Sequence, residues 1–235
     1  MKSKIIILGI LASSMVLMNA CEPKFRGKKI LDNEIETTKT EAPQIEASNV
    51  EDSKVEPIEN DNKHLEFKGI PINGSLNKFV TNMKTAGFKT VANSNERAIL
   101  EGDFAGYKDC TLYVQTIDGA DIVSTIVVEF PEYDRWEHLY GNYKNLKEML
   151  TQKYGKPHSV REEFQDYMHR TDDDKMRQVH KGECKYKTEF HTEKGKIILW
   201  IEQGEDLIIK SGSICLKYID KINIGVIKQK AIDDL

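Results

Sequence analysis

The chain has 235 residues, of which 31% are charged, 39% are hydrophobic and 8% are aromatic, and its formal net charge is −4 at pH 7. Its lysines are spread along the chain and form no basic stripe, which argues against nucleic acid as a partner. Residues 64–235 have the composition of a globular domain, whereas the residues before them do not.

The N-terminus has the pattern of an export signal. Lys2 and Lys4 form a short positive region, and residues 5–18 (IIILGILASSMVLM) form an apolar run without a charged side chain. This run is shorter than the roughly 20 residues that a membrane-spanning helix needs. It fits the central segment of a secretory signal, so residues 1–20 are predicted to be a signal peptide.

The end of this segment, residues 17–21 (LMNAC), resembles a bacterial lipobox. The usual pattern has leucine three places before the cysteine, where this chain has Met18, followed by Asn19. The resemblance implies that the Cys21 thiol is acylated and that cleavage makes Cys21 the new N-terminus. Two or three acyl chains give stable anchoring, because each buried CH₂ contributes about 0.8 kcal/mol. The alternative is an ordinary secretory signal beside an unmodified Cys21.

The residue after the cysteine bears on the location of such a lipoprotein. This residue is Glu22, and not the aspartate that is associated with retention in the inner membrane. The residues next to Cys21 also lack the acidic cluster that resembles a surface-export tag. The resemblance therefore implies an anchor in the outer membrane, on its periplasmic face.

Residues 21–63 are predicted to be a lipidated, disordered acidic tether. The segment is rich in Glu, Asp, Thr, Ser, Asn and Pro and has only isolated Ile and Val residues. It cannot bury enough apolar surface to offset its chain entropy. As a flexible coil, residues 22–62 would reach about 35 Å from the membrane.

Residues 64–235 are long enough for one domain with a sizeable core, in two repeat-like halves at about 64–131 and 132–235. The first half begins with a predicted helix over residues 75–88, with Ser75 as N-cap and Gly87 after its last turn. A longer helix over residues 134–157 begins the second half, with Asp134 as N-cap and Gly155 and Pro157 at its end.

Each predicted helix is followed by segments with strand periodicity. These segments are residues 107–115, 121–130, 185–192, 196–203 and 214–219. The turns between them are short, which indicates antiparallel pairing and an α+β fold of tandem helix-plus-antiparallel-sheet units, with the helices on one sheet face. Residues 220–235 are predicted to form a terminal helix packed on the sheet through Ile224, Ile227, Ala231 and Leu235, with a strand start at 221–224 as the alternative.

Two resemblances accompany this layout. The repeated helix-plus-sheet unit is similar in architecture to β-lactamase inhibitory proteins and related small envelope lipoproteins. The stretches HLEFKGIPINGSLNKFV, LEGDFAGYKDC and KQKAIDDL resemble lipoproteins of Bacteroidetes-type bacteria. The second resemblance covers nearly the whole globular part and implies an envelope lipoprotein, without catalytic residues that could be transferred to this chain.

Three cysteines lie in the globular part. Cys184 and Cys215 both belong to the second set of strands, and they are the preferred pair if a disulfide forms in an oxidising compartment. Cys110 alternates with Leu112 and Val114, so it is expected to be a small buried hydrophobe. A nucleophilic Cys184 beside His180 or His191 is the less favoured alternative.

Motifs of known chemistry are missing from the sequence. It contains no CxxC, HExxH, GxGxxG, GxxxxGK[ST] or GxSxG pattern, and we expect neither a metal nor a cofactor. Four histidines recur every eleven residues, at His158, His169, His180 and His191, without sharing a helix face. The cluster Thr171–Asp174 lacks the spacing of a calcium loop and is better explained as a helix N-cap.

Three aromatic residues are candidates for a binding surface: Tyr113, Trp136 and Trp200. Aromatic side chains anchor many interfaces, although Trp136 lies on an apolar helix stripe and also fits a core position. We therefore expect a non-catalytic binding domain, anchored to the membrane by lipid, with a protein or an envelope polymer as partner. A periplasmic hydrolase whose active site the sequence does not reveal is the alternative. A concave pocket with convergent titratable groups would favour that alternative.

Overall fold

The structure is a computed structural model that describes residues 63–165, 171–204, 209–233 and 235. The predicted signal peptide, the lipidation site Cys21 and the tether up to residue 62 lie outside the described residues. Within the described ranges, no helix combines the length and the apolar character needed to cross a membrane.

In chain order the elements are β1 (Glu66–Phe67), β2 (Ile70–Pro71), α1 (Leu76–Thr85), β3 (Lys89–Asn93), β4 (Arg97–Phe104), β5 (Tyr107–Thr116), β6 (Val123–Glu129), α2 (Trp136–Tyr154), β7 (Ser159–Phe164), α3 (Asp172–His180), β8 (Cys184–His191), β9 (Gly195–Gln203), β10 (Gly212–Asp220) and α4 (Lys221–Asp233). Strands β1 and β2 form a small hairpin, and the other eight strands form one sheet.

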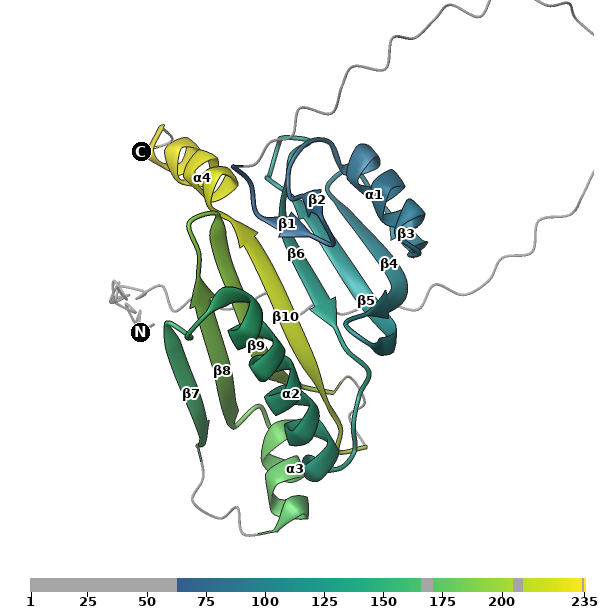
Figure 1. Cartoon of the computed structure of the whole chain (residues 1–235), viewed down its shortest axis with the longest axis vertical. Coiled ribbons are helices and arrows are strands. Elements are labelled where there is room, and N and C mark those ends of the chain that lie inside the picture. The colour runs from purple at the N-terminus through teal and green to yellow at the C-terminus, as the bar shows by residue number, and fades with distance from the viewer. Residues whose placement is uncertain (1–62, 166–170, 205–208, 234) are drawn as a thin grey trace, which may run out of the picture. The chain divides into compact units, whose positions relative to one another are not determined.

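The large sheet has the strand order β3-β4-β5-β6-β10-β9-β8-β7, and every neighbouring pair is antiparallel (Figure 1). Each half of the domain supplies four strands to the large sheet, preceded by a helix: α1 before β3–β6, and α2 before β7–β10. The last strands of the two halves, β6 and β10, pair at the centre. This arrangement confirms the predicted α+β fold of tandem helix-plus-antiparallel-sheet units.

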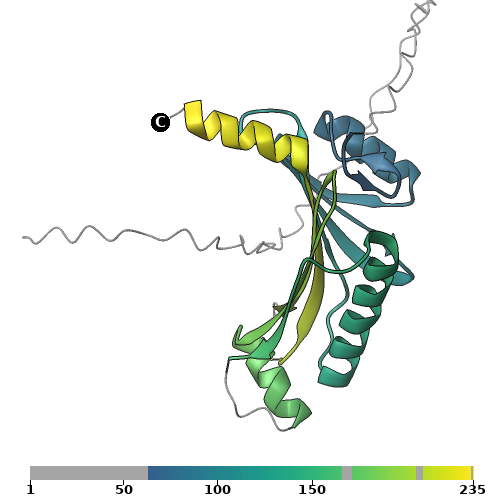
Figure 2. The same cartoon turned by 60° about the vertical axis from the view of Figure 1, so that its left-hand side comes forward.

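The core lies on one side of the sheet, which we call the helix side. One ladder row on this side runs across six strands through Leu100, Leu112, Val128, Leu216, Leu199 and Thr188, each at most 1% exposed. Helices α1 and α2 cover this side (Figure 2). The periodicity of two along each strand therefore places this fully buried row on the helix side.

Helix α1 begins and ends as its sequence predicts. Ser75 accepts a hydrogen bond from the Lys78 N–H at 3.4 Å, and Gly87 follows the helix with a φ of 98°. The Leu76 N–H has a second acceptor that the sequence did not indicate, because Asp121 Oδ1 lies 2.8 Å from it. The buried face of α1 consists of Leu76, Phe79, Val80 and Met83.

The starts of α2 and α3 differ from each other. The prediction that Asp134 caps α2 is wrong by one residue, since the N-cap is Arg135, which makes no side-chain capping bond. Thr171, in contrast, forms a complete capping box with Asp174 at the start of α3. The acidic cluster is therefore a helix start, as predicted.

Helix α4 exists, but the prediction that it packs along the sheet is wrong. It begins at Lys221, so the alternative strand start is also wrong, and Asn223 is its one buried residue among those described. Figure 2 shows α4 extending away from the end of the sheet, on the side opposite α1 and α2. Side chains such as Val226 (45% exposed) and Ile232 (60% exposed) lie in solvent.

Candidate binding surface

The sheet face opposite α1 and α2, here called the open face, carries two of the predicted site residues. Tyr113 and Trp200 occupy neighbouring ladder rows on it. The first row is Ile99, Tyr113, Val127, Lys217, Ile198 and Glu189, and the second is Glu101, Thr111, Glu129, Cys215, Trp200 and Lys187. Most of these side chains are half-buried, while Val127, Ile198 and Cys215 are at most 9% exposed.

Glu129 joins three strands at the centre of the open face. The Tyr113 hydroxyl on β5 donates to Glu129 Oε2 at 3.0 Å, and the Ser213 hydroxyl on β10 donates to Glu129 Oε1 at 2.9 Å. Because the Ser213 hydroxyl is completely buried and donates to Glu129, the carboxylate has a defined position, and it in turn fixes the position of the Tyr113 hydroxyl. Glu129 and Ser213 were not predicted as site residues.

Trp200 is positioned in the same manner on β9. Its indole Nε1 donates to Glu202 Oε2 at 3.0 Å, and its backbone lies opposite Cys215 on one side and Lys187 on the other. Tyr113 and Trp200 are separated by β6 and β10, which corresponds to about 14 Å at the usual strand spacing. The two aromatic side chains therefore mark the two ends of a patch and do not touch.

Charges on the open face are largely paired on its β8 side. Lys187 Nζ lies 3.0 Å from Glu189 Oε1, and His191 Nε2 lies 3.8 Å from Glu189 Oε2. Burial alone would raise the pKa of Glu189, but the hydrogen bond from Lys187 and the charges of Lys187 and Lys196 lower it below its ordinary value. This end of the face therefore keeps an ionised carboxylate among basic groups.

Trp136 is not part of the open face, and its prediction as a binding residue is wrong. It lies on the helix side at the start of α2 and is 5% exposed. Its ring stacks on Tyr140 at 5.4 Å and contacts Phe164 and Tyr186 at 5.0 and 5.2 Å between centroids. The apolar stripe of α2 determined the place of this residue, as the alternative interpretation expected.

The preferred disulfide between Cys184 and Cys215 is not present, because Cys184 is a free, buried thiol. Strand β9 lies between the two strands that carry these cysteines. The register also places Cys184 on the helix side and Cys215 on the open face, so their Cβ atoms point apart. Burial raises the pKa of Cys184 to about 12 and that of Cys110 to about 11, which keeps both thiols protonated at neutral pH.

Two of the regularly spaced histidines meet at the edge of the sheet. The rings of His158 and His191 stack with centroids 3.8 Å apart, while His169 lies outside the described residues. In the part of the chain that the structure describes, no three side chains of the metal-binding types converge on one point. The histidine spacing therefore produces a ring contact rather than a recognisable ligand set.

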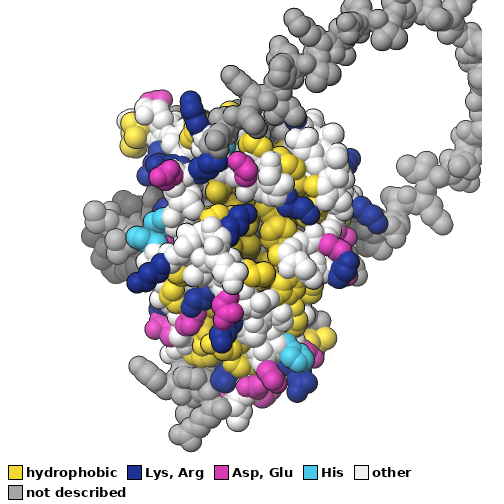
Figure 3. Space-filling view, viewed as in Figure 1, with side chains coloured by type: hydrophobic (Ala, Val, Ile, Leu, Met, Phe, Trp, Pro, Cys, Tyr) yellow, Lys and Arg dark blue, Asp and Glu magenta, His cyan; other side chains and the backbone are white. Residues whose placement is uncertain are grey.

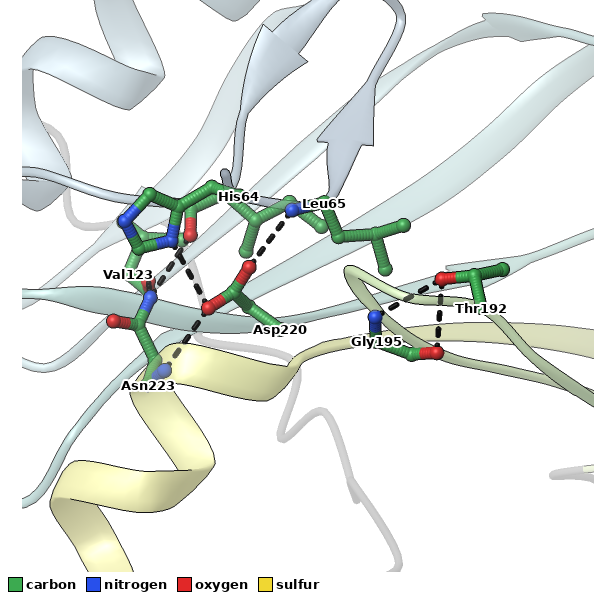
Figure 4. Close-up of polar contacts among 8 residues, drawn as sticks. His64, Leu65, Val123, Thr192, Gly195, Asp220 and Asn223 are labelled. Carbon is green, nitrogen blue, oxygen red and sulfur yellow. Dashed lines mark hydrogen bonds and ion pairs between the residues drawn. The ribbon is translucent and has the colours of Figure 1, made fainter. Parts of the chain in front are cut away.

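The described chain enters the domain beside α4, at a buried polar cluster that we call the clasp (His64, Leu65, Asp220 and Asn223). His64 Nδ1 lies 3.0 Å from Asp220 Oδ1, and the Leu65 N–H donates to Asp220 Oδ2 at 2.8 Å (Figure 4). The side-chain amide of Asn223 donates to the backbone carbonyls of Ile72 and Val123. The clasp therefore fixes the start of the domain to the junction of β10 and α4.

The helix side has an apolar surface of its own. Figure 3 shows hydrophobic side chains gathered in a band between α1 and α2. On this side the Tyr107 hydroxyl donates to Asn142 Oδ1 of α2 at 3.0 Å, and its ring meets Phe130 edge-on at 5.0 Å. Tyr107 thus connects the first half of the domain to the helix of the second.

Comparison with known proteins gives no match to a family model, to a curated protein or to a solved structure.

Proposed function

We propose that this chain is a lipid-anchored protein of the bacterial cell envelope whose α+β domain binds a partner without catalysing a reaction. The lipobox-like residues 17–21 support the anchor, with Cys21 as the acylated residue. The clasp supports a defined attachment, because the chain that follows the tether is fixed to Asp220 as soon as the domain begins. The outer membrane is the proposed location.

The observation that carries the binding function is the open face itself. It extends across strands of both halves of the domain, and α1 and α2 lie on the opposite side. Its two large aromatic side chains are each held by a hydrogen bond to a carboxylate, Tyr113 by Glu129 and Trp200 by Glu202. Aromatic side chains that are ordered before binding lose little entropy when a partner covers them. We propose a protein as the partner.

The test is chemical crosslinking in native membranes, followed by pull-down of the full-length chain. Tyr113→Ala and Trp200→Ala should each reduce the amount of crosslinked partner, and the double variant should reduce it further. Val91→Ser is the matched control, since Val91 is 57% exposed on β3 and belongs to neither ladder row of the open face. Equal recovery of the partner with the double variant and the wild type would sink the proposed surface.

The anchor has a separate readout. Mass spectrometry of the mature wild-type chain should detect acyl groups on Cys21, and Cys21→Ser should carry no acyl group and should keep its signal segment. An unmodified mature N-terminus would remove the lipid anchor and leave the binding proposal to its own experiment.

A further inference from the structure

We infer that β7 is a dimerisation edge, at which a second copy of this chain adds its own β7 in antiparallel fashion around a two-fold axis through Glu162. Strand β7 (Ser159–Phe164) is the last strand of the sheet, and it pairs with β8 alone among the described strands. An edge strand offers a row of backbone donors and acceptors to a further strand.

The backbone of β7 fixes which residues face this edge. The Gln165 N–H donates to the Glu183 carbonyl at 2.9 Å, and hydrogen-bonded pairs alternate along an antiparallel ladder. Arg161 and Glu163 therefore bond inward to β8. Val160 and Glu162 direct their N–H and C=O groups to the outer edge, where the strand of a second copy could bond to them.

The side chains of β7 select one register for such a pairing. With Glu162 opposite its own copy, Arg161 faces Glu163 of the second chain on the open face. In the single chain Arg161 Nε donates to Glu163 Oε1 of its own strand at 2.7 Å, and pairing of two copies would join these two ion pairs into a network of four charges. In the same register Val160 faces Phe164 of the second chain on the helix side. Val160 is 48% exposed in the single chain and would gain an apolar neighbour. Opposite charges and apolar pairs at directly opposed positions stabilise a sheet.

The two Glu162 side chains do not prevent this register. Each is neutralised by Lys147 of its own α2, with Nζ 2.6 Å from Glu162 Oε1. The neighbouring register, with Arg161 opposite its own copy, would place like charges together and set Val160 against Glu162. The charges of β7 therefore favour the register with Glu162 opposite its own copy over the neighbouring one, and they do not prevent a second strand from pairing at this edge.

The opposite edge of the sheet lacks this property. Strand β3 has a register shift between Thr90 and Ala92, with Val91 at the irregular position. A bulge of this kind disturbs the row of backbone groups and protects an edge from further pairing. Strand β7 pairs with β8 over six consecutive residues without such a shift, so the inference concerns β7 alone.

Cysteine crosslinking of the full-length chain in membranes tests the register. Glu162→Cys places a thiol next to its own copy at the two-fold axis and should give a disulfide-linked dimer under mild oxidation. Arg161→Cys and Glu163→Cys are the matched controls, because in this register neither residue faces its own copy. Equal crosslinking at all three positions, or none at Glu162→Cys, would overturn the inference.

Charge exchange tests the same edge without a covalent bond. Arg161→Glu and Glu163→Arg should each raise the dimer Kd by about tenfold or more, because two favourable cross-strand pairs become repulsive. The two single variants mixed together should form a heterodimer, and the double variant Arg161→Glu/Glu163→Arg should restore the homodimer. Analytical ultracentrifugation measures these states, and thermal unfolding reports whether each variant is folded. Folded single variants that dimerise like the wild type would contradict the inference.

Discussion

Asp220 and His64 are 156 positions apart in the chain, yet His64 Nδ1 lies 3.0 Å from Asp220 Oδ1 in a buried site. The same carboxylate accepts hydrogen bonds from the Leu65 N–H and from the N–H of Asn223 in the first turn of α4. One buried side chain therefore closes the domain at its N-terminal entry and caps its last helix at the same time.

Removing the charge of Asp220 should destabilise the domain without changing the volume of the site. In Asp220→Asn, one carboxylate oxygen is replaced by an NH₂ group, which faces a backbone N–H of either Leu65 or Asn223. A buried donor that loses its acceptor costs about 1–3 kcal/mol. Denaturant unfolding should show a loss of this size, with Asp109→Asn as the control, because Asp109 is exposed. A loss no greater than that of the control would show that the clasp contributes little.

The hydroxyl groups of Tyr143 and Thr188 form a second buried link, between α2 and β8. Their oxygen atoms are 2.7 Å apart, and both residues are completely buried. Tyr143→Phe and Thr188→Val should each lower the free energy of unfolding by about 1–3 kcal/mol, because each leaves a buried hydroxyl without its partner. The double variant should lose less than the sum of the two. Strict additivity in this double-mutant cycle would mean that the two groups are not coupled.

Two glycines should respond in opposite directions to the same substitution. A Cβ at Gly195 would lie 2.2 Å from the Ile219 carbonyl oxygen, so Gly195→Ala must push β9 and β10 apart. Gly141 lies in α2 with no such neighbour within 4 Å. Gly141→Ala should therefore stabilise the chain by about 0.5–1 kcal/mol, through the higher helix propensity of alanine. Thermal unfolding of the two variants checks both signs, and stabilisation by Gly195→Ala would contradict the close approach.

Local signals predicted local structure well. Ser75 and Gly87 bracket α1, and the Thr171 cluster begins α3, because a cap depends on residues within one helical turn. The polar edge strands β3 and β7 were missed, since their exposed residues show no alternation of apolar and polar side chains. A segment at the edge of a sheet is a strand because it pairs with its neighbour, and this pairing cannot be predicted from the periodicity of its own residues.

Relations between distant strands were outside the reach of the sequence. Glu129 and Ser213 meet only because β6 and β10 are adjacent, although the residues are 84 positions apart. The wrong pairing of Cys184 with Cys215 has the same origin, since strand order places β9 between them. The prediction that α4 packs on the sheet was wrong, because the spacing of Ile224 and Ile227 predicts an apolar helix face but does not predict which element covers that face.

The buried thiol of Cys184 should make the domain less stable in alkali. Burial raises its pKa from an ordinary 9.0 to about 12 in the folded chain. Between these values the unfolded chain has lost the proton that the folded chain keeps, so raising the pH favours unfolding. The contribution of the protonated Cys184 to the free energy of unfolding is therefore fully present below pH 9. Above pH 9 it decreases, at a rate that approaches about 1.4 kcal/mol per pH unit.

Comparison with Cys184→Ala isolates this effect. The truncation leaves a small cavity whose cost does not depend on pH, so the variant starts less stable at neutral pH and should show a shallower decline between pH 9 and about pH 10. In this interval the slopes of unfolding free energy against pH should differ between the two chains by about 0.7 kcal/mol per unit at pH 9, where half of the unfolded thiol has lost its proton, and by about 1.2 kcal/mol per unit at pH 10. Parallel slopes in denaturant titrations would show that Cys184 does not stay protonated in the folded chain. Buried tyrosines such as Tyr218, whose pKa is also raised by burial, act on both chains alike and cancel in the comparison.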